Sequence, residues 1–198
     1  MFDFTLEVYK LLLKRLIEKG YLIVPFGEYI LKKDSYNKVA IIRHDVDRLS
    51  ELSLNIAEIE NKLNIKTSYY YRIVKGSNNP DIIKKVSQLG HEIGYHYEDL
   101  TIAKGDYSKA IKMFEKNLAY FRQFYPVKTI CMHGSPLSKL DNRKIWDKIN
   151  YRDYGIIGEP YYETNFNKFL YLTDTGRRWN GDKFSIRDKV HNTYDFNF

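Results

Sequence analysis

Hydrophobic residues along the chain follow two alternating patterns. Short runs rich in β-branched and aromatic residues are typical of buried strands. Longer stretches with an apolar residue at every third or fourth position are typical of amphipathic helices. The runs predict strands at residues 39–44, 67–74, 91–95, 129–132, 154–157 and 169–173. The longer stretches predict helices at residues 6–19, 50–63, 80–89, 106–125 and 141–149, with residues 21–29 as a connector.

The alternation of strands and helices predicts an α/β fold with a parallel sheet, because parallel strands need crossover connections. Right-handed connections allow a closed or partly closed barrel, and an open doubly wound sheet is the alternative. No repeat, linker or low-complexity tract divides the sequence, so residues 1–198 are expected to form a single domain. A full barrel typically needs about 250 residues, which is more than this chain has.

Titratable residues gather where the predicted strands end. These residues are Asp45, Asp47, Arg72, His96, His133, Glu159 and Asp174. Parallel barrels build their active sites at this rim, so the pattern indicates a functional site, although Glu159 is expected at the surface. Lys38 and Lys128 show that strand starts also carry charge.

Asp45 and Asp47 are separated by one residue at the end of the first predicted strand. Side chains two positions apart share a face of a strand, so the two carboxylates are expected to converge. Such a pair is costly unless a cation lies between the acids or one of them is protonated. A divalent cation would solve the problem; the alternative is that the acids cap the next helix or pair with Arg43 and Arg48. His44 points to the other face, where packing or a supporting hydrogen bond is expected.

Composition and charge narrow the class of protein. The net charge of +7 is not concentrated in a basic run or a nucleic-acid-binding motif, so no nucleic-acid partner is expected. The single Cys131 excludes an internal disulfide, fits a reducing compartment and is expected to be a small buried hydrophobe. Asp3 and Glu7 interrupt any signal peptide, and no apolar run is long enough to span a membrane. A soluble, cytoplasmic protein is therefore expected.

A second informative stretch reads Gly-His-Glu-Ile-Gly-Tyr-His at residues 90–96, downstream of Arg-His-Asp-Val-Asp at residues 43–47. In order, strand context and separation, the two segments together resemble the polysaccharide deacetylases, the family that includes chitin and peptidoglycan deacetylases. The resemblance implies a metal-dependent hydrolase of N-acetyl groups on a distorted (β/α) barrel, which the chain's length makes incomplete. In the matched segment, Gly94 would leave room for an ion, and His91 is expected to be structural.

The resemblance also implies roles for individual residues. Asp45 would be the general base, and Asp47 and His96 would be ligands of one divalent metal ion. Histidine nitrogen and carboxylate oxygen suit Zn²⁺, with Co, Ni and Mn as alternatives. The ion would acidify a water molecule and polarise the acetamide carbonyl, and Asp45 would accept the proton.

The sequence departs from the family's pattern at three places. Leu100 stands where the family has a second histidine, four residues after the first. His133 is therefore the expected third metal ligand, or else the group that protonates the leaving amine. His-Gly-Ser-Pro at residues 133–136 replaces the family's arginine–proline motif, and residues 189–198 offer only His191 in place of the C-terminal catalytic histidine. These departures predict a variant or truncated member.

Four further residues are candidates for substrate binding. They are Arg72, Asp174, Arg177 and Trp179. The Trp179 ring could stack on a sugar and Arg177 could bind a carboxylate or phosphate, although residues 174–179 could equally be a solvated turn.

Together these features predict a metal-dependent hydrolase that removes N-acetyl, amide-linked acyl, groups from a sugar or glycan. Because the amide bond cleaved would lie on a carbohydrate and not in a peptide, the protein would be a hydrolase of non-peptide C–N bonds. One alternative is a catalytically inactive, glycan-binding deacetylase-like domain, which Leu100 and the missing C-terminal histidine favour. Another is a metal-dependent phosphoesterase on a similar barrel, which usually needs two metal ions. The sequence does not determine the oligomeric state.

Overall fold

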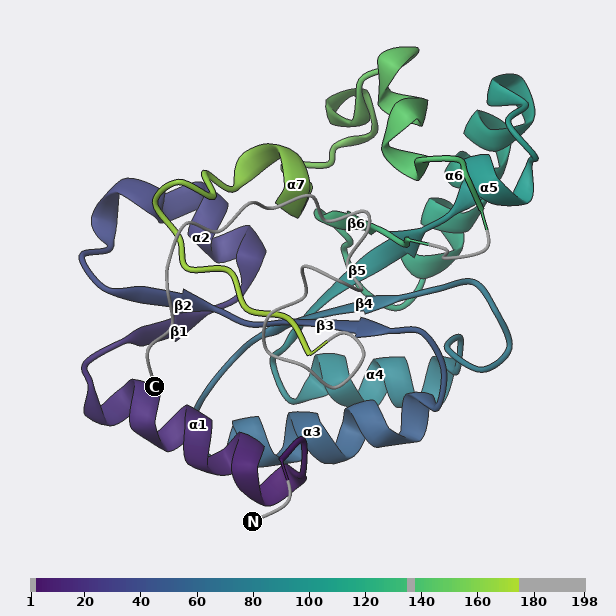
Figure 1. The fold of residues 1–198 in the computed structure, drawn as a ribbon. Coiled ribbons are helices and arrows are strands. Elements are labelled where there is room, and N and C mark those ends of the chain that lie inside the picture. The colour runs from purple at the N-terminus through teal and green to yellow at the C-terminus, as the bar shows by residue number, and fades with distance from the viewer. Residues whose placement is uncertain (1–2, 135–137, 175–198) are drawn as a thin grey trace.

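The computed structural model describes residues 3–134 and 138–174. Helices and strands alternate through most of this part of the chain (Figure 1). In chain order they are α1 (Leu6–Glu18), β1 (Leu22–Val24), α2 (Phe26–Lys32), η1 (Lys33–Ser35), β2 (Val39–Ile41), β3 (Arg43–Val46), α3 (Ser50–Lys62), β4 (Ser68–Tyr71), α4 (Pro80–Gln88), β5 (Glu92–Tyr97), α5 (Asp99–Ile102), α6 (Tyr107–Phe121), β6 (Ile130–Met132), η2 (Asn142–Asp147), η3 (Tyr151–Tyr154) and α7 (Pro160–Glu163).

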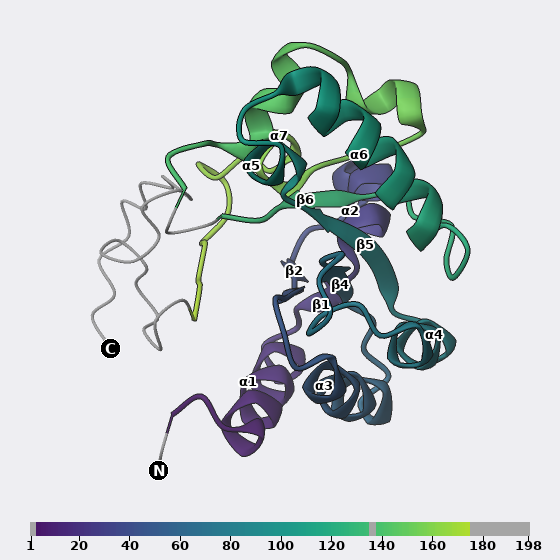
Figure 2. The same ribbon diagram turned by 90° about the vertical axis from the view of Figure 1, so that its right-hand side faces the viewer.

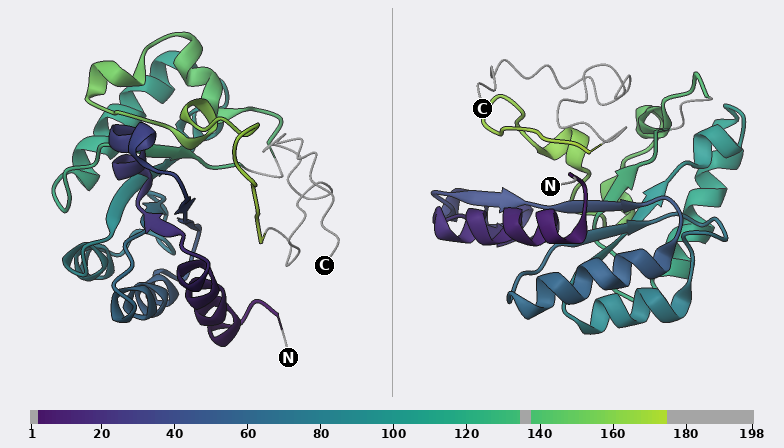
Figure 3. Two further views of the ribbon diagram at one scale, coloured as in Figure 1. Left: turned by 90° about the vertical axis from the view of Figure 1, so that its left-hand side faces the viewer. Right: turned by 60° about the horizontal axis from the view of Figure 1, so that its bottom comes forward.

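The main sheet has four parallel strands in the order β3-β4-β5-β6. It curls into an open half-barrel, as Figures 1 and 2 show. A second, two-stranded parallel sheet pairs β1 with β2, and Figure 3 shows α1 lying along this pair. The expected α/β organisation with parallel strands is confirmed, and the sheet is only partly barrel-like.

One face of the main sheet carries the apolar core. Its alternate positions are aromatic or aliphatic, and the register places Tyr71 beside Tyr95 and Tyr95 beside Ile130. Helices α3, α4 and α6 bury this face with residues such as Ile83 and Phe114, both fully buried. Because successive side chains of a strand point to opposite faces, the other face receives the remaining positions.

That opposite face is polar even where it is buried. Glu92 of β5 is buried there and accepts hydrogen bonds from the Gly27 amide at 3.0 Å, the Thr129 hydroxyl at 2.6 Å and the Ser68 hydroxyl at 2.5 Å. Burial raises the pKa of Glu92 above its ordinary value, although these three donors oppose the shift. A Cβ atom at Gly27 would lie 2.5 Å from Glu92 Oε1, so only glycine lets α2 approach this closely.

Several sequence predictions about elements are wrong. Residues 154–157 form no strand, and the adjacent chain contributes one isolated parallel bridge, between Gly158 and Thr129. Residues 169–173 are also irregular, and within them Phe169 packs its ring edge-on against Tyr29 of α2. The helix expected at 141–149 is the 3-10 helix η2, and the connector expected at 21–29 contains β1 and the start of α2. Tertiary packing overrides local pattern in all four segments.

Three element boundaries also differ from expectation. The first predicted strand is divided at Ile42 into β2, which pairs with β1, and β3, which pairs with β4. Strand β5 extends to Tyr97, so His96 lies within the strand and not after it. Helix α3 is preceded by Leu49 in the left-handed conformation, so Ser50 is its first residue and not its N-cap.

No helix within residues 3–134 and 138–174 has the length and apolar character needed to cross a membrane. Cys131 is buried in β6, as expected for a small hydrophobe.

Candidate metal centre

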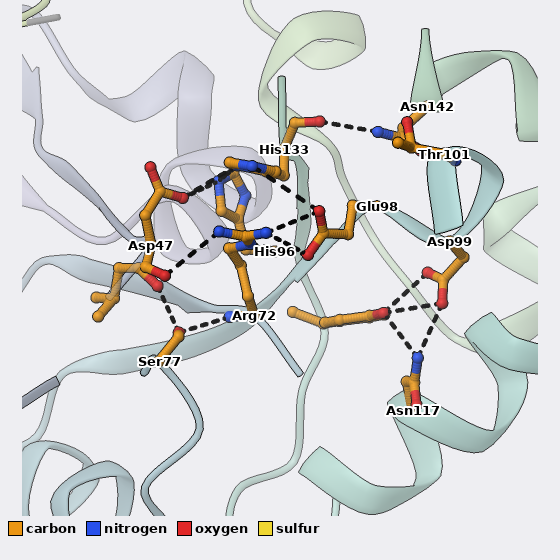
Figure 4. Close-up of polar contacts among 12 residues, drawn as sticks. Asp47, Arg72, Ser77, His96, Glu98, Asp99, Thr101, Asn117, His133 and Asn142 are labelled. Carbon is orange, nitrogen blue, oxygen red and sulfur yellow. Dashed lines mark hydrogen bonds and ion pairs between the residues drawn. The ribbon is translucent and has the colours of Figure 1, made fainter. Parts of the chain in front are cut away.

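Three side chains that could ligate a metal ion meet at the carboxyl ends of strands in the main sheet (Figure 4). Asp47 follows β3, His96 is the fifth residue of β5, and His133 directly follows β6. The register pairs His96 with Cys131, so His133 stands two residues further along the neighbouring strand, on the same face. The His133 amide continues the ladder by donating to the Tyr97 carbonyl at 2.9 Å.

The three ligand atoms are spaced as one metal ion requires. Asp47 Oδ1 lies 3.0 Å from His133 Nδ1 and 3.6 Å from His96 Nε2. The two imidazole nitrogens are 3.2 Å apart. Tetrahedral ligands about 2.0–2.1 Å from Zn²⁺ lie about 3.3–3.4 Å from one another. The residues present therefore fit a Zn²⁺-class ion with an open fourth position.

His96 presents an acceptor lone pair to this site. Its side chain is only 3% exposed, and its Nδ1 lies 2.9 Å from the Cys131 carbonyl oxygen. A carbonyl can only accept a hydrogen bond, so Nδ1 carries the proton and Nε2 is the unprotonated nitrogen of the neutral ring. Burial lowers the pKa of His96, although Asp45 and Asp47 oppose the shift, so the neutral form is favoured.

Asp47 is the most accessible of the three ligands, with a side chain 48% exposed. Partial burial opposes its ionisation, but the hydrogen bond from His133 and the electrostatic influence of His96, His133 and Arg72 outweigh it. The pKa of Asp47 is therefore lower than its ordinary value. A carboxylate that stays ionised in a cluster of imidazoles is a suitable ligand for a divalent cation.

Asp45 lies beside this cluster. Its Oδ2 is 3.9 Å from His96 Nε2, and its Oδ1 is 3.1 Å from the Arg43 guanidinium. The pairing with Arg43 that the sequence left open is therefore present, together with the expected convergence of Asp45 and Asp47 on His96. Asp45 also forms a second possible metal-binding group with His96 and Cys131.

Arg72, a candidate for substrate binding, lies at the end of β4 between the ligand-bearing strands. Its Nε and Nη2 atoms each donate to one carboxylate oxygen of Glu98, both at 2.8 Å. Its Nη1 lies 3.4 Å from the Asp47 backbone carbonyl. Glu98 is not among the residues predicted from the sequence, although its position two residues after His96 indicates that both side chains leave the same strand face.

No contact with this cluster is found for the other predicted site residues within the described part of the chain. Asp174 is exposed, and Arg177 and Trp179 lie outside the described residues. Leu100, at the position of the family's second histidine, is buried in the apolar core.

Two sequence predictions near the site are wrong. Glu159 was expected at the surface but is fully buried. It accepts hydrogen bonds from the backbone amides of Met132 and Tyr161. Burial raises the pKa of Glu159 to about 7. Gly94 leaves no room for an ion, because a Cβ atom there would lie 2.3 Å from the Tyr70 ring. The neighbouring tyrosine occupies the space that a pattern of residue types alone left empty.

The other two histidines within the described residues have structural surroundings, as expected, and His191 lies outside those residues. His44 faces away from the acids, and its Nε2 lies 2.8 Å from Glu60 Oε1. His91 is buried, with its Nε2 3.1 Å from the Ala57 carbonyl. Both belong to the network around the buried carboxylate of Glu60, on the opposite side of the sheet from the metal-binding cluster.

Comparison of the chain with protein-family models, with curated proteins and with solved structures gives no match. The functional interpretation therefore rests on the geometry of the chain's own residues.

Proposed function

We propose that this protein is a metal-dependent hydrolase that removes N-acetyl groups from a sugar or glycan. The observation that carries the proposal is the cluster of Asp47, His96 and His133, whose ligand atoms lie 3.0–3.6 Å apart. Beside it stands the second carboxylate, Asp45, at 3.9 Å from His96. Asp45, Asp47 and His96, in this order along the chain, also match the resemblance to the polysaccharide deacetylases, whereas His133 departs from it.

The residues divide into two roles. Asp47, His96 and His133 hold the divalent ion, for which Zn²⁺ is the best candidate and Co²⁺, Ni²⁺ and Mn²⁺ are alternatives. When bound, such an ion supplies Lewis-acid polarisation of the acetamide carbonyl and makes water more acidic. Asp45 accepts the proton of the water molecule whose oxygen adds to the carbonyl carbon, and that proton passes to the amine nitrogen as the C–N bond breaks. Arg43 keeps the Asp45 carboxylate oriented through its 3.1 Å ion pair.

The geometry favours one metal ion over the two of a phosphoesterase. Among the described residues, the two groups that could hold an ion share His96. The other nitrogen of that ring is engaged by the Cys131 carbonyl, so a single Nε2 atom serves both groups. One imidazole nitrogen binds one ion, and the two groups are therefore alternative ligand sets for the same ion.

Two substitutions separate metal binding from catalysis. Asp47→Ala removes a ligand and is expected to abolish stoichiometric metal binding, whereas Asp45→Asn is expected to keep the metal and lose turnover by at least about 100-fold, the range of a lost general base. Metal content is measured by elemental analysis, and turnover by acetate release from N-acetylglucosamine oligosaccharides. The matched control is Asp153→Asn at an exposed position, which is expected to change neither.

The outcomes distinguish the candidate functions. Unchanged metal content in Asp47→Ala would show that the ligand assignment is wrong. One tightly bound metal ion without acetate release by the wild type would support the inactive glycan-binding alternative. A content near two ions per chain would support a phosphoesterase.

A further inference from the structure

The two imidazoles of the metal-binding cluster each have one nitrogen turned away from it. For His96 this nitrogen is Nδ1, which the Cys131 carbonyl holds at 2.9 Å. For His133 it is Nε2, which lies 3.9 Å from Glu98 Oε2 (Figure 4). Metal-binding histidines usually donate their second nitrogen to a carbonyl or carboxylate, which fixes the tautomer and the ring orientation. Both kinds of acceptor are present here, one for each ring.

Glu98 is itself held in a rigid setting. Its side chain is 6% exposed, and both of its oxygens accept hydrogen bonds from Arg72. The backbone of Arg72 is also restrained, because its amide donates to the Ser77 hydroxyl at 2.8 Å. That hydroxyl in turn donates to the backbone carbonyl of Val46, the residue before Asp47. The carboxylate is thus fixed relative to the chain segments that carry the metal ligands.

His133 is restrained at its backbone as well. Its amide donates to the Tyr97 carbonyl at 2.9 Å, and its carbonyl accepts from the Asn142 side chain at 2.9 Å. With the backbone of His133 fixed in this way, the rotation and the tautomer of its ring are what other contacts must determine. The present separation of 3.9 Å from Glu98 makes the contact electrostatic, since an N–H···O hydrogen bond has a usual length of about 2.9 Å.

We propose that Glu98 is a positioning residue for the metal-bound state: when the divalent ion takes the place of the proton between His133 Nδ1 and Asp47, Glu98 holds His133 as the Nε2–H tautomer, so that Nδ1 binds the ion. The inference rests on the proposed metal centre and deepens it. A negative carboxylate opposite Nε2 favours a proton on that nitrogen, and the same imidazole then directs its lone pair at Asp47 and His96. Arg72 acts through Glu98 by fixing both carboxylate oxygens.

The next residue provides a matched control. Asp99 is also a buried carboxylate, but it accepts hydrogen bonds from Tyr95 and Asn117, on the side of the chain away from His133 (Figure 4). A substitution of Asp99 perturbs the same turn of chain and a comparable polar network without touching a metal ligand. An effect that is specific to Glu98 therefore cannot come from disturbing this segment in general.

The test measures Co²⁺ binding by the full chain in competition with a chromogenic chelator. Glu98→Gln must present an amide NH₂ either to Arg72 or to His133, so it is expected to weaken Co²⁺ affinity by about 10- to 100-fold. Glu98→Asp keeps the negative charge beside Arg72 but withdraws it from His133, and it is expected to weaken affinity in the same direction. Asp99→Asn is expected to bind Co²⁺ within about 2-fold of the wild type, as a change outside the ligand shell should.

A second readout follows the tautomer directly. In ¹⁵N-histidine NMR spectra of Zn²⁺-loaded wild type, His133 is expected to carry its proton on Nε2, and in the Glu98 variants that signal is expected to be lost or to exchange. Equal Co²⁺ affinity and an unchanged tautomer in both Glu98 variants would overturn the inference while leaving the metal centre intact. An equal loss of affinity in Asp99→Asn would also overturn it. Absence of Co²⁺ binding by the wild type would instead overturn the proposed function itself.

Discussion

At the scale of single residues, the carboxylate of Glu60 is fully buried and surrounded by donors. It accepts hydrogen bonds from Thr67 at 2.8 Å, from Tyr69 at 2.5 Å and from Tyr9 of the first helix, and it lies 2.8 Å from His44. Burial opposes its ionisation, but His44 and the hydroxyl donors outweigh burial and lower the pKa of Glu60 to about 2. A buried charge of this kind is tolerated because donors surround it.

This pKa predicts how stability depends on pH. Because the folded-state pKa is about 2 and the ordinary value is 4.5, Glu60 contributes its full stability above about pH 5 and loses it as the pH falls towards 2. The contribution lost between pH 7 and pH 3 is expected to be about 2 kcal/mol. Urea unfolding at the two pH values measures it. The difference should shrink by that amount in Glu60→Gln and stay unchanged in Glu58→Gln, an exposed position on the same helix; equal behaviour of the two variants would contradict the prediction.

At the scale of elements, helix starts follow local sequence closely. The Thr5 hydroxyl accepts from the Val8 amide at 3.3 Å, and the Asp106 carboxylate accepts from the Lys109 amide at 3.0 Å, as their positions in the sequence predict. Pro80 occupies the first turn of α4, also as predicted. A cap satisfies an amide that has no partner within the helix, so it depends only on residues two or three positions apart.

The cap of α6 offers a quantitative test. Asp106→Ala leaves the Lys109 amide without its acceptor and removes a negative charge from the helix N-terminus, so it is expected to lower the free energy of unfolding by about 1 kcal/mol. Chemical denaturation monitored by circular dichroism measures the loss. Asp153→Ala removes an acid from an exposed position without a helix-capping bond in the structure and should cost less than half as much. A loss of similar size in both variants would show that net charge, and not capping, sets the effect.

At the scale of the whole molecule, the proposed ion would link segments that are far apart in the sequence. Asp47, His96 and His133 follow or lie in β3, β5 and β6, so one ion would fasten three strands of an open sheet at one edge. Among the strands of residues 3–134 and 138–174 the half-barrel is open, so no ring closure within these residues holds the strand ends together. Binding to the folded state alone stabilises it by mass action.

Metal addition is therefore expected to raise the thermal stability of the wild type. At a free Zn²⁺ concentration about 100 times the dissociation constant, the free energy of unfolding should increase by about 2.7 kcal/mol. Thermal unfolding with and without Zn²⁺, followed by reversal with a chelator, measures the shift. Asp47→Ala should show no such shift, and a shift as large as that of the wild type would place the ion elsewhere.

The sequence predicted the local parts of the fold and of the candidate site. Helices α1, α4 and α6 begin where their caps indicate, and alternation placed Asp45 and Asp47 on one strand face and His44 on the other. The sequence could not show that β2 and β3 separate at Ile42, because that break depends on which strands pair across the fold.

The sequence by itself determined which side chains could bind a metal and at which ends of which strands they would stand. This follows from periodicity and caps, which depend on residues a few positions apart. Only the tertiary structure decided that His133 comes within 3.2 Å of His96, that Glu98 pairs with Arg72, and that Tyr70 fills the space beside Gly94. These contacts join strands that are tens of residues apart, and their distances are set by sheet curvature and side-chain packing, which no local pattern contains.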